Sequence, residues 1–315
     1  MNASIAVGDG QQPLWKRIVD FPLVAMALAI ALFVGTTWAA ARIGRELPPM
    51  DELWLHASRA TIIIVLVLAV YKLAIRWLGR PQRDDLPARG AVKGLSLGIL
   101  LGFVLFSAIV GIAALIDVYN IVGEGGFGSM LDTAIVMAIM PAFMEEILFR
   151  GILFRHLEQF GGSWFALALT SALFGLAHIF NPNASALSSL AIAIEAGILL
   201  GGAYMLTRSL WMAIGLHFAW NFTQGFIFDV PVSGIDQHGM VEASLSGNVL
   251  LSGGTFGLEA SLIAMVIATV AGIWLVMRAV KAGELVRPWW VRRRLDREAA
   301  AEPPLLDGLA SEPSA

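Results

Sequence analysis

The sequence predicts an all-α, polytopic membrane protein with about eight transmembrane helices, and three observations lead to this fold class. Hydrophobic residues make up 57% of the 315 residues and charged residues only 14%, whereas a typical soluble domain carries about 25% charged residues. The apolar residues gather in blocks about as long as the ~20 residues that cross a bilayer. Segments such as 21–41 and 61–74 are apolar on every helix face, without the single apolar stripe of a soluble helix.

Eight spans are expected in chain order, and we place them at 21–41, 59–78, 92–116, 131–156, 163–180, 187–206, 210–228 and 258–280. The first span follows Lys16 and Arg17 and ends in small residues, so a cleaved signal peptide is the alternative interpretation. Its apolar stretch is longer than the roughly 7–15 residues of a signal peptide, and a retained helix is therefore favoured. Pro141 lies inside the fourth span and Pro182 closes the fifth, which neighbouring helices can accommodate.

Two spans carry glycines at four-residue spacing, which lets helix backbones approach closely. These glycines are Gly94, Gly98 and Gly102 in the third span, and Gly197 and Gly201 in the sixth. We interpret them as packing positions within the chain in preference to a dimer interface. The sequence leaves the oligomeric state open.

The basic residues predict the orientation, because Lys and Arg favour the cytoplasmic side of a membrane. With the N-terminus inside, all 21 basic residues except Arg42, Arg45 and Arg59 are cytoplasmic. No Lys or Arg occurs in the external segments 117–130, 181–186 and 229–257. This pattern predicts a protein of the cell membrane with an even number of spans and both termini in the cytoplasm.

The chain divides into three parts by composition. We expect a cytoplasmic N-terminal segment at 1–20, a helical membrane domain at 21–280, and a basic tail at 281–315 that is disordered after about residue 296, because its composition cannot form a core. The sequence has no cysteine, which excludes disulfides, a Cys-ligated zinc site and a thiol nucleophile. It has no nucleotide-binding glycine loop, and we expect no nucleic-acid partner.

Ionisable residues inside the spans are the candidates for function, since buried charge in a membrane is costly and normally faces a protein interior or a watery cavity. The fourth span contains Glu145, Glu146 and Arg150. Glu146 and Arg150 are four residues apart and can pair on one helix face, which leaves Glu145 to point elsewhere. The alternative for this segment is a purely structural ion pair with a spare glutamate.

Three further spans add polar side chains. His178 ends the fifth span, and His217 and Asn221 share one face of the seventh because they are four residues apart. Each could also simply hydrogen-bond a neighbouring helix. Glu195 stands alone in the sixth span, where it either lines a cavity or pairs with an arginine.

Together, these residues have the chemistry of a hydrolytic site. Glu, His and Asn side chains can activate water and stabilise an oxyanion, and Glu and His can also bind zinc. Other hydrolase signatures are missing, since the sequence contains neither an HExxH helix nor a GxSxG nucleophile elbow. A serine mechanism is therefore poorly supported.

The pattern of these residues resembles a known family. Glu145-Glu146-x-x-x-Arg150, Phe174-x-x-x-His178 and His217-x-x-x-Asn221 are similar to the three motifs of the CAAX protease and bacteriocin-processing family of intramembrane proteases. That family includes the type II CAAX prenyl endopeptidases and proteins named for lysostaphin resistance. The matching region covers about residues 130–228, and the resemblance implies an endopeptidase whose membrane-embedded site opens to the cytoplasm.

The resemblance also implies roles for the residues that match. Glu145 and His178 would activate water, His217 and Asn221 would hold the oxyanion, and Glu146 with Arg150 would support them. Whether a metal takes part is left open: a zinc ion would be held by Glu145, His178 and His217, or the site could work through the glutamate without a metal. The expected partners are the lipid bilayer and a peptide or membrane-protein substrate.

Two other functions stay open at this point. One is a non-enzymatic immunity or scaffold protein that keeps the fold, and the other is a proton-coupled transporter, in which intramembrane Glu and His relay protons. One geometric difficulty also remains. The predicted spans put Glu145 near the centre of its helix but His178 about 9 Å outward from the centre of its own, at 1.5 Å per residue.

Overall fold

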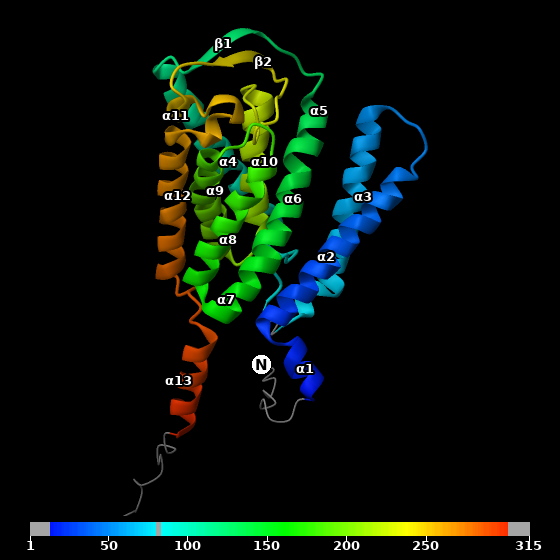
Figure 1. Cartoon of the computed structure of the whole chain (residues 1–315), viewed down its shortest axis with the longest axis vertical. Coiled ribbons are helices and arrows are strands. Elements are labelled where there is room, and N and C mark those ends of the chain that lie inside the picture. The colour runs from blue at the N-terminus through cyan, green and yellow to red at the C-terminus, as the bar shows by residue number, and fades with distance from the viewer. Residues whose placement is uncertain (1–12, 80–82, 302–315) are drawn as a thin grey trace, which may run out of the picture.

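The computed structural model describes residues 13–79 and 83–301 and is mostly helical (Figure 1). Short 3₁₀ turns occur between several helices. The α-helices of the described residues are α1 (Leu14–Val19), α2 (Pro22–Arg45), α3 (Glu52–Leu73), α4 (Ala91–Leu115), α5 (Met130–Asp132), α6 (Met140–Glu146), α7 (Arg155–Gly161), α8 (Ser163–Ala177), α9 (Ala186–Thr207), α10 (Leu210–Phe222), α11 (Val249–Ser252), α12 (Leu262–Lys281) and α13 (Trp289–Ala301).

Six helices are long and apolar enough to cross a membrane, which confirms an all-α polytopic protein. In the described residues these are Pro22–Arg45, Glu52–Trp77, Ala91–Leu115, Ser163–Phe180, Ala186–Thr207 and Leu262–Lys281. They correspond to six of the eight predicted spans, with boundaries that differ by up to seven residues.

The other two predicted spans coincide with composite helices. The first runs from Met130 to Gly161 and alternates α5, α6 and α7 with π-helical segments at Thr133–Ile139 and Ile147–Phe154. The second joins α10 to a π-helical segment at Thr223–Ile227. These helices carry the polar residues of interest, and π-helical turns inside helices are frequent at functional sites.

The structure adds a small sheet that the all-helical prediction did not contain. Strands β1 (Tyr119–Glu124) and β2 (Val241–Leu245) pair antiparallel. They come from two of the segments without basic residues that were predicted to be external, and in Figure 1 they cover the end of the bundle beyond α11 and α5. The prediction missed them because both strands are short and follow long apolar blocks.

The end of the chain also differs from the expectation. We expected no regular structure after about residue 296, but helix α13 continues to Ala301. Residues 1–12 and 302–315 carry the rest of the predicted terminal segments, and they lie outside the described residues.

Helix α4 packs directly on α10 through the predicted glycine face. A Cβ atom at Gly98 would lie 2.2 Å from the Met212 carbonyl oxygen, and one at Gly102 would lie 2.5 Å from the Leu216 carbonyl oxygen. Gly197 on α9 similarly touches Ser171 of α8. The glycines therefore pack helices within the chain, as predicted, and they fix the position of α10.

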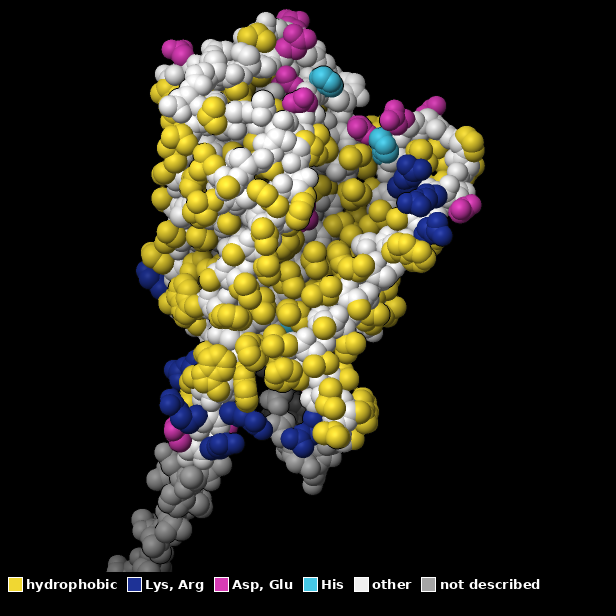
Figure 2. All heavy atoms as spheres, viewed as in Figure 1, with side chains coloured by type: hydrophobic (Ala, Val, Ile, Leu, Met, Phe, Trp, Pro, Cys, Tyr) yellow, Lys and Arg dark blue, Asp and Glu magenta, His cyan; other side chains and the backbone are white. Residues whose placement is uncertain are grey.

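The surface is divided in the way that a bilayer requires. Figure 2 shows hydrophobic side chains over the middle of the molecule and charged side chains gathered toward its two ends. The apolar surface includes long side chains such as Leu100, Phe103 and Val104 on α4, each more than 40% exposed. Such side chains match the lipid-facing surface of a membrane helix.

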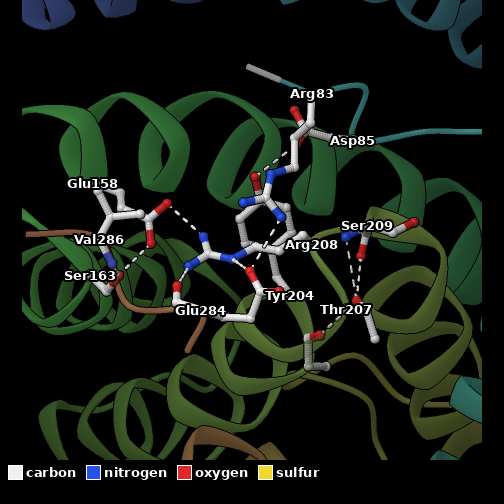
Figure 3. A network of polar contacts seen from close by, with 11 residues as sticks. Arg83, Asp85, Glu158, Ser163, Tyr204, Thr207, Arg208, Ser209, Glu284 and Val286 are labelled. Atoms are coloured by element: carbon white, nitrogen blue, oxygen red, sulfur yellow. Dashed lines mark hydrogen bonds and ion pairs between the residues drawn. The ribbon is translucent and has the colours of Figure 1, made fainter. Parts of the chain in front are cut away.

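At the end opposite the sheet, a network around Arg208 joins four parts of the chain (Figure 3). Arg208 follows α9 with a φ of 51°, and its guanidinium pairs with Glu158 of α7 at 2.6 Å and with Glu284, after α12, at 3.2 Å. Ser163, at the start of α8, donates to Glu158 and accepts from the Val286 backbone. The network fixes the ends of α7, α8, α9 and α12 relative to one another.

Candidate active site

A buried ion pair on the Met130–Gly161 helix forms the base of the site. Arg150 Nη1 donates to Glu146 Oε1 at 2.9 Å, as the four-residue spacing predicts, and both side chains are at least 98% buried. The arginine Cζ atom lies 4.7 Å from the centre of the Phe174 ring, and its Nη2 donates to the Ala196 carbonyl of α9. This pair therefore connects the composite helix to α8 and α9.

His217 of α10 lies between the two adjacent glutamates. Its Nδ1 is 3.0 Å from Glu146 Oε1, and its Nε2 is 3.9 Å from Glu145 Oε2. Because the paired Glu146 carboxylate can only accept, Nδ1 carries a proton. The second nitrogen, Nε2, is then the one that faces Glu145. Neighbouring glutamates on one helix thus reach opposite nitrogens of the same ring.

Glu145 itself is less enclosed than its neighbour. Its side chain is 31% exposed, compared with 0% for Glu146. Its Oε2 atom is buried and has no hydrogen-bond partner among the described residues. This oxygen keeps its lone pairs unused, although it is closed to solvent in this conformation.

His178 is held by its own helix. Its Nδ1 is 2.7 Å from the Phe174 carbonyl oxygen, which can only accept, so this nitrogen carries the proton. The other nitrogen, Nε2, therefore keeps a lone pair. The Phe174 ring packs on both histidines, with ring centres 4.8 Å from His178 and 6.2 Å from His217.

The structure changes the count that suggested a difference in depth between Glu145 and His178. The composite helix continues to Gly161, five residues beyond the predicted end of the fourth span, whereas α8 begins at Ser163 as predicted. Counted from the turn between these helices, Glu145 lies 16 residues before Gly161 and His178 lies 15 residues after Ser163. The two residues are therefore at similar chain distances from the turn that joins their helices.

Asn221 is oriented by a carbonyl group that a proline sets free. Pro141 has no N–H to donate to the Met137 carbonyl four residues earlier. Asn221 Nδ2 donates to that carbonyl oxygen at 2.9 Å. A side-chain amide has two N–H donors, so one donor of Asn221, which is 7% exposed, remains for the interior.

A small cavity is lined by His178, His217 and Asn221, whereas Glu145 is not among its lining residues. It has a volume of about 30 Å³, which is room for roughly two water molecules, since one needs about 10–15 Å³. Glu195 and Glu259 also line it. Glu195 therefore lines the cavity, which was one of the two alternatives expected for it.

Glu259 belongs to the site region although the sequence did not single it out. It lies in the turn Leu258–Ala260 that precedes α12, is 2% exposed and accepts a hydrogen bond from the Ser233 backbone. Burial raises the pKa of its carboxyl group to about 7, against the opposing hydrogen bonds from Ser233. Only its charge at the predicted edge of a span could have drawn attention to it.

The predicted zinc ligands do not form a metal site in this conformation. In residues 13–79 and 83–301, no three His, Asp or Glu side chains are grouped closely enough to hold a metal ion. Among the three expected ligands, His217 Nε2 and Glu145 Oε2 are 3.9 Å apart, near the roughly 3.4 Å that separates two ligands of a tetrahedral zinc ion, but no third described ligand joins them closely enough. The donor set therefore does not fit zinc as it stands.

Comparisons with known proteins match the region that holds these residues. Residues 127–223 match the family described as type II CAAX prenyl endopeptidase Rce1-like. A protein of Bacillus subtilis (strain 168), named "Putative membrane peptidase YdiL", is 28% identical over 192 residues, which cover 55% of this chain and 73% of that protein. No solved structure matches the chain. The family resemblance of the three motifs is confirmed.

Proposed function

The protein carries the Rce1-like segment of the type II CAAX prenyl endopeptidases at residues 127–223, and on this premise we propose that it is an intramembrane endopeptidase. Its substrates are peptide segments of membrane-associated proteins. Glu145, His178, His217 and Asn221 are the proposed catalytic residues, and Glu146 and Arg150 are positioning residues.

One observation carries this proposal. The two histidines each have Nδ1 fixed by a hydrogen bond, to Phe174 and to Glu146, and both line the same cavity as Asn221. Hydrolysis is favoured by hydrogen-bond donors and acceptors that already surround a cavity large enough for water, because these groups need not reorient during the reaction. A merely structural set of polar residues would satisfy one another and leave no free Nε2 and no free carboxylate oxygen.

The proposed reaction begins with a water molecule between Glu145 and His178. The Glu145 carboxylate takes a proton from this water while the lone pair of His178 Nε2 orients it. The water oxygen forms a bond to the scissile carbonyl carbon, and the carbonyl oxygen becomes negative. The carbon–nitrogen bond then breaks as Glu145 returns the proton to the leaving amine, so that a carboxylic acid and an amine are released.

Asn221 and His217 stabilise the oxyanion in this mechanism. The second Nδ2 proton of Asn221 is a ready donor. His217 donates from Nε2 only when it is doubly protonated, a state that the two flanking glutamates favour electrostatically. Loss of one such donor typically lowers kcat by about 10²–10³-fold. These steps use the side chains alone, and a chelator tests whether a metal ion also takes part.

The test is cleavage of a fluorogenic peptide library by the purified full-length protein. We expect Glu145→Gln and His178→Ala to lose activity by about 10²-fold or more, the usual contribution of acid–base groups. Glu124→Gln is the matched control, because Glu124 is an exposed carboxylate on β1. Wild-type rates in the Glu145 and His178 variants would refute the assignment.

The role of a metal is tested on the same substrate. Activity that survives a chelator supports the glutamate mechanism. Activity lost with the chelator and restored by zinc would instead require the site to rearrange around a metal ion.

A further inference from the structure

Two buried carboxylates line the same cavity as His178 and His217. Glu195 projects from α9 and is 0% exposed, and Glu259 precedes α12 and is 2% exposed. Neither residue has a part in the proposed hydrolysis. Burying two carboxylates close together is costly unless a partner compensates them, so their presence in the same cavity needs an explanation.

Glu195 has no partner within the protein. Both of its carboxylate oxygens are buried and without a hydrogen bond among the described residues. Glu259 accepts a hydrogen bond from the Ser233 backbone N–H, and the Ser233 and Trp220 side chains and the charge of His217 also stabilise its carboxylate. No lysine or arginine lines the cavity, and Arg150 is already paired with Glu146. The cavity wall therefore holds more acidic groups than the surrounding residues compensate.

The shape of the cavity limits what could supply the missing positive charge. Its remaining walls are mostly apolar and include Ile192, Leu199, Leu200 and Trp220. Because the cavity has room for about two water molecules in this conformation, a cationic group would have to enter on a slender, unbranched alkyl chain that moves these walls apart and buries its methylene groups against them. Among natural side chains, lysine fits this description better than arginine, whose planar guanidinium is broader.

We propose that Glu195 and Glu259 form an acidic subsite that receives the ammonium group of a substrate lysine adjacent to the scissile bond. The lysine would enter past His178 and His217, since these residues line the same cavity. This inference rests on the proposed endopeptidase function, and it adds a specificity for one class of substrate. Glu195 and Glu259 are specificity residues in this scheme and take no part in bond cleavage.

The first experiment compares peptides that differ by one charged group. Quenched fluorogenic peptides would place lysine, norleucine, arginine or glutamate at each position from three residues before to three residues after the scissile bond. Norleucine keeps the alkyl chain of lysine and lacks its ammonium group. We expect the purified wild-type protein to prefer lysine over norleucine at one position by about tenfold or more in kcat/KM, equivalent to about 1.4 kcal/mol.

The variants separate recognition from catalysis. Glu195→Gln and Glu259→Gln should each reduce the lysine preference, and the double variant should abolish it while still cleaving the norleucine peptide. Glu242→Gln, at an exposed position on β2, is the matched control and should keep the preference. A lysine preference that persists in the double variant would overturn the subsite, as would its absence in an active wild-type protein.

A second measurement does not depend on cleavage. The lysine side chain alone, as n-butylammonium chloride, should raise the melting temperature of the wild-type protein and of Glu145→Gln. The broader tetramethylammonium ion should not, and neither ion should stabilise the Glu195→Gln, Glu259→Gln double variant. Equal stabilisation of the wild-type protein and the double variant would refute the subsite.

The two measurements also separate the two proposals. A wild-type protein that binds n-butylammonium through these carboxylates but cleaves no peptide would refute the proposed endopeptidase function and leave a cation site. A protein that cleaves peptides without any dependence on lysine or on the two carboxylates would refute the subsite alone.

Discussion

Two adjacent glutamates differ in environment because they face different neighbours. Glu146 is fully buried and bonded to both Arg150 and His217, whereas Glu145 keeps a free carboxylate oxygen. The four-residue spacing from Glu146 to Arg150 was sufficient to predict their ion pair, because that contact lies within one helix. The contact of Glu146 with His217 joins two helices 71 residues apart, and no local pattern could predict it.

Replacing one member of the buried pair should destabilise the protein. Glu146→Gln keeps the shape of the side chain but leaves the charge of Arg150 uncompensated, and we expect a loss of about 3–5 kcal/mol in the free energy of unfolding. Activity should fall as well, because His217 loses the acceptor that fixes its Nδ1. Denaturant unfolding in detergent measures the first effect, with the exposed Glu124→Gln as control. Unchanged stability would show that the pair is not buried as described.

Glu259 should make the stability depend on pH. Its folded-state pKa of about 7 lies above the ordinary value of 4.5, so folding favours the protonated form. The contribution to stability is therefore fully present below about pH 4.5, falls as the pH rises toward 7, and is constant above that. The change is on the order of 3 kcal/mol at 1.36 kcal/mol per pKa unit.

The check is a series of melting temperatures between pH 4.5 and 8 for the wild-type protein and for Glu259→Gln. The amide cannot titrate, so the difference between the two curves should change through this range and then level off. Parallel curves would mean that Glu259 is not buried in a titrating form.

At the scale of helices, the sequence predicted most spans but not their internal geometry. The apolar blocks gave the positions of the long helices, because lipid exposure depends on composition alone. The π-helical segments on either side of α6 and the continuation of this composite helix to Gly161 were not predictable, since they depend on how helices pack. The start of α8 at Ser163 agrees with the predicted fifth span, so the end of the fourth span was the boundary in error.

The contact between α4 and α10 should be sensitive to a single methyl group. At Gly98, a Cβ atom would lie 2.2 Å from the Met212 carbonyl oxygen and 2.7 Å from the Leu216 nitrogen, whereas at Gly111 it would meet nothing within 4 Å. We expect Gly98→Ala to lower stability by about 1–3 kcal/mol through overpacking and to reduce activity, because α10 carries His217 and Asn221. Gly111→Ala, on the same helix, should change neither property.

Both effects can be measured on one preparation, by thermal unfolding and by peptide cleavage. A Gly98→Ala variant with the stability and activity of Gly111→Ala would contradict the close packing of these two helices.

At the scale of the whole molecule, the site lies toward the end of the bundle that bears the sheet. His178 ends α8, Glu259 precedes α12 and Ser233 belongs to the segment between α10 and α12. The basic residues of the C-terminal region lie at the opposite end (Figure 2). If Lys and Arg mark the cytoplasmic side as they usually do, we predict that the cavity lies nearer the external side, whereas the family resemblance implied a cytoplasmic opening.

The orientation can be tested with single cysteines, because the native sequence contains none. Asp236→Cys lies in the exposed loop after α10, and Ala282→Cys directly follows α12. We expect a membrane-impermeant maleimide to label the first in intact cells and the second only after lysis. The reverse pattern would invert the orientation, and labelling of both in intact cells would show that α12 does not span the membrane.

The carbonyl group that Pro141 leaves free has a consequence for protein engineering. Met137, Pro141 and Asn221 act as one unit, in which the proline withholds a donor and the asparagine takes its place. In a chimera, the fourth span could come from a similar protein that has another residue in place of Pro141. The backbone N–H of that residue would compete for the Met137 carbonyl oxygen, and the Asn221 side-chain amide would lose its hydrogen bond. Segments exchanged with similar proteins should therefore carry both helices together.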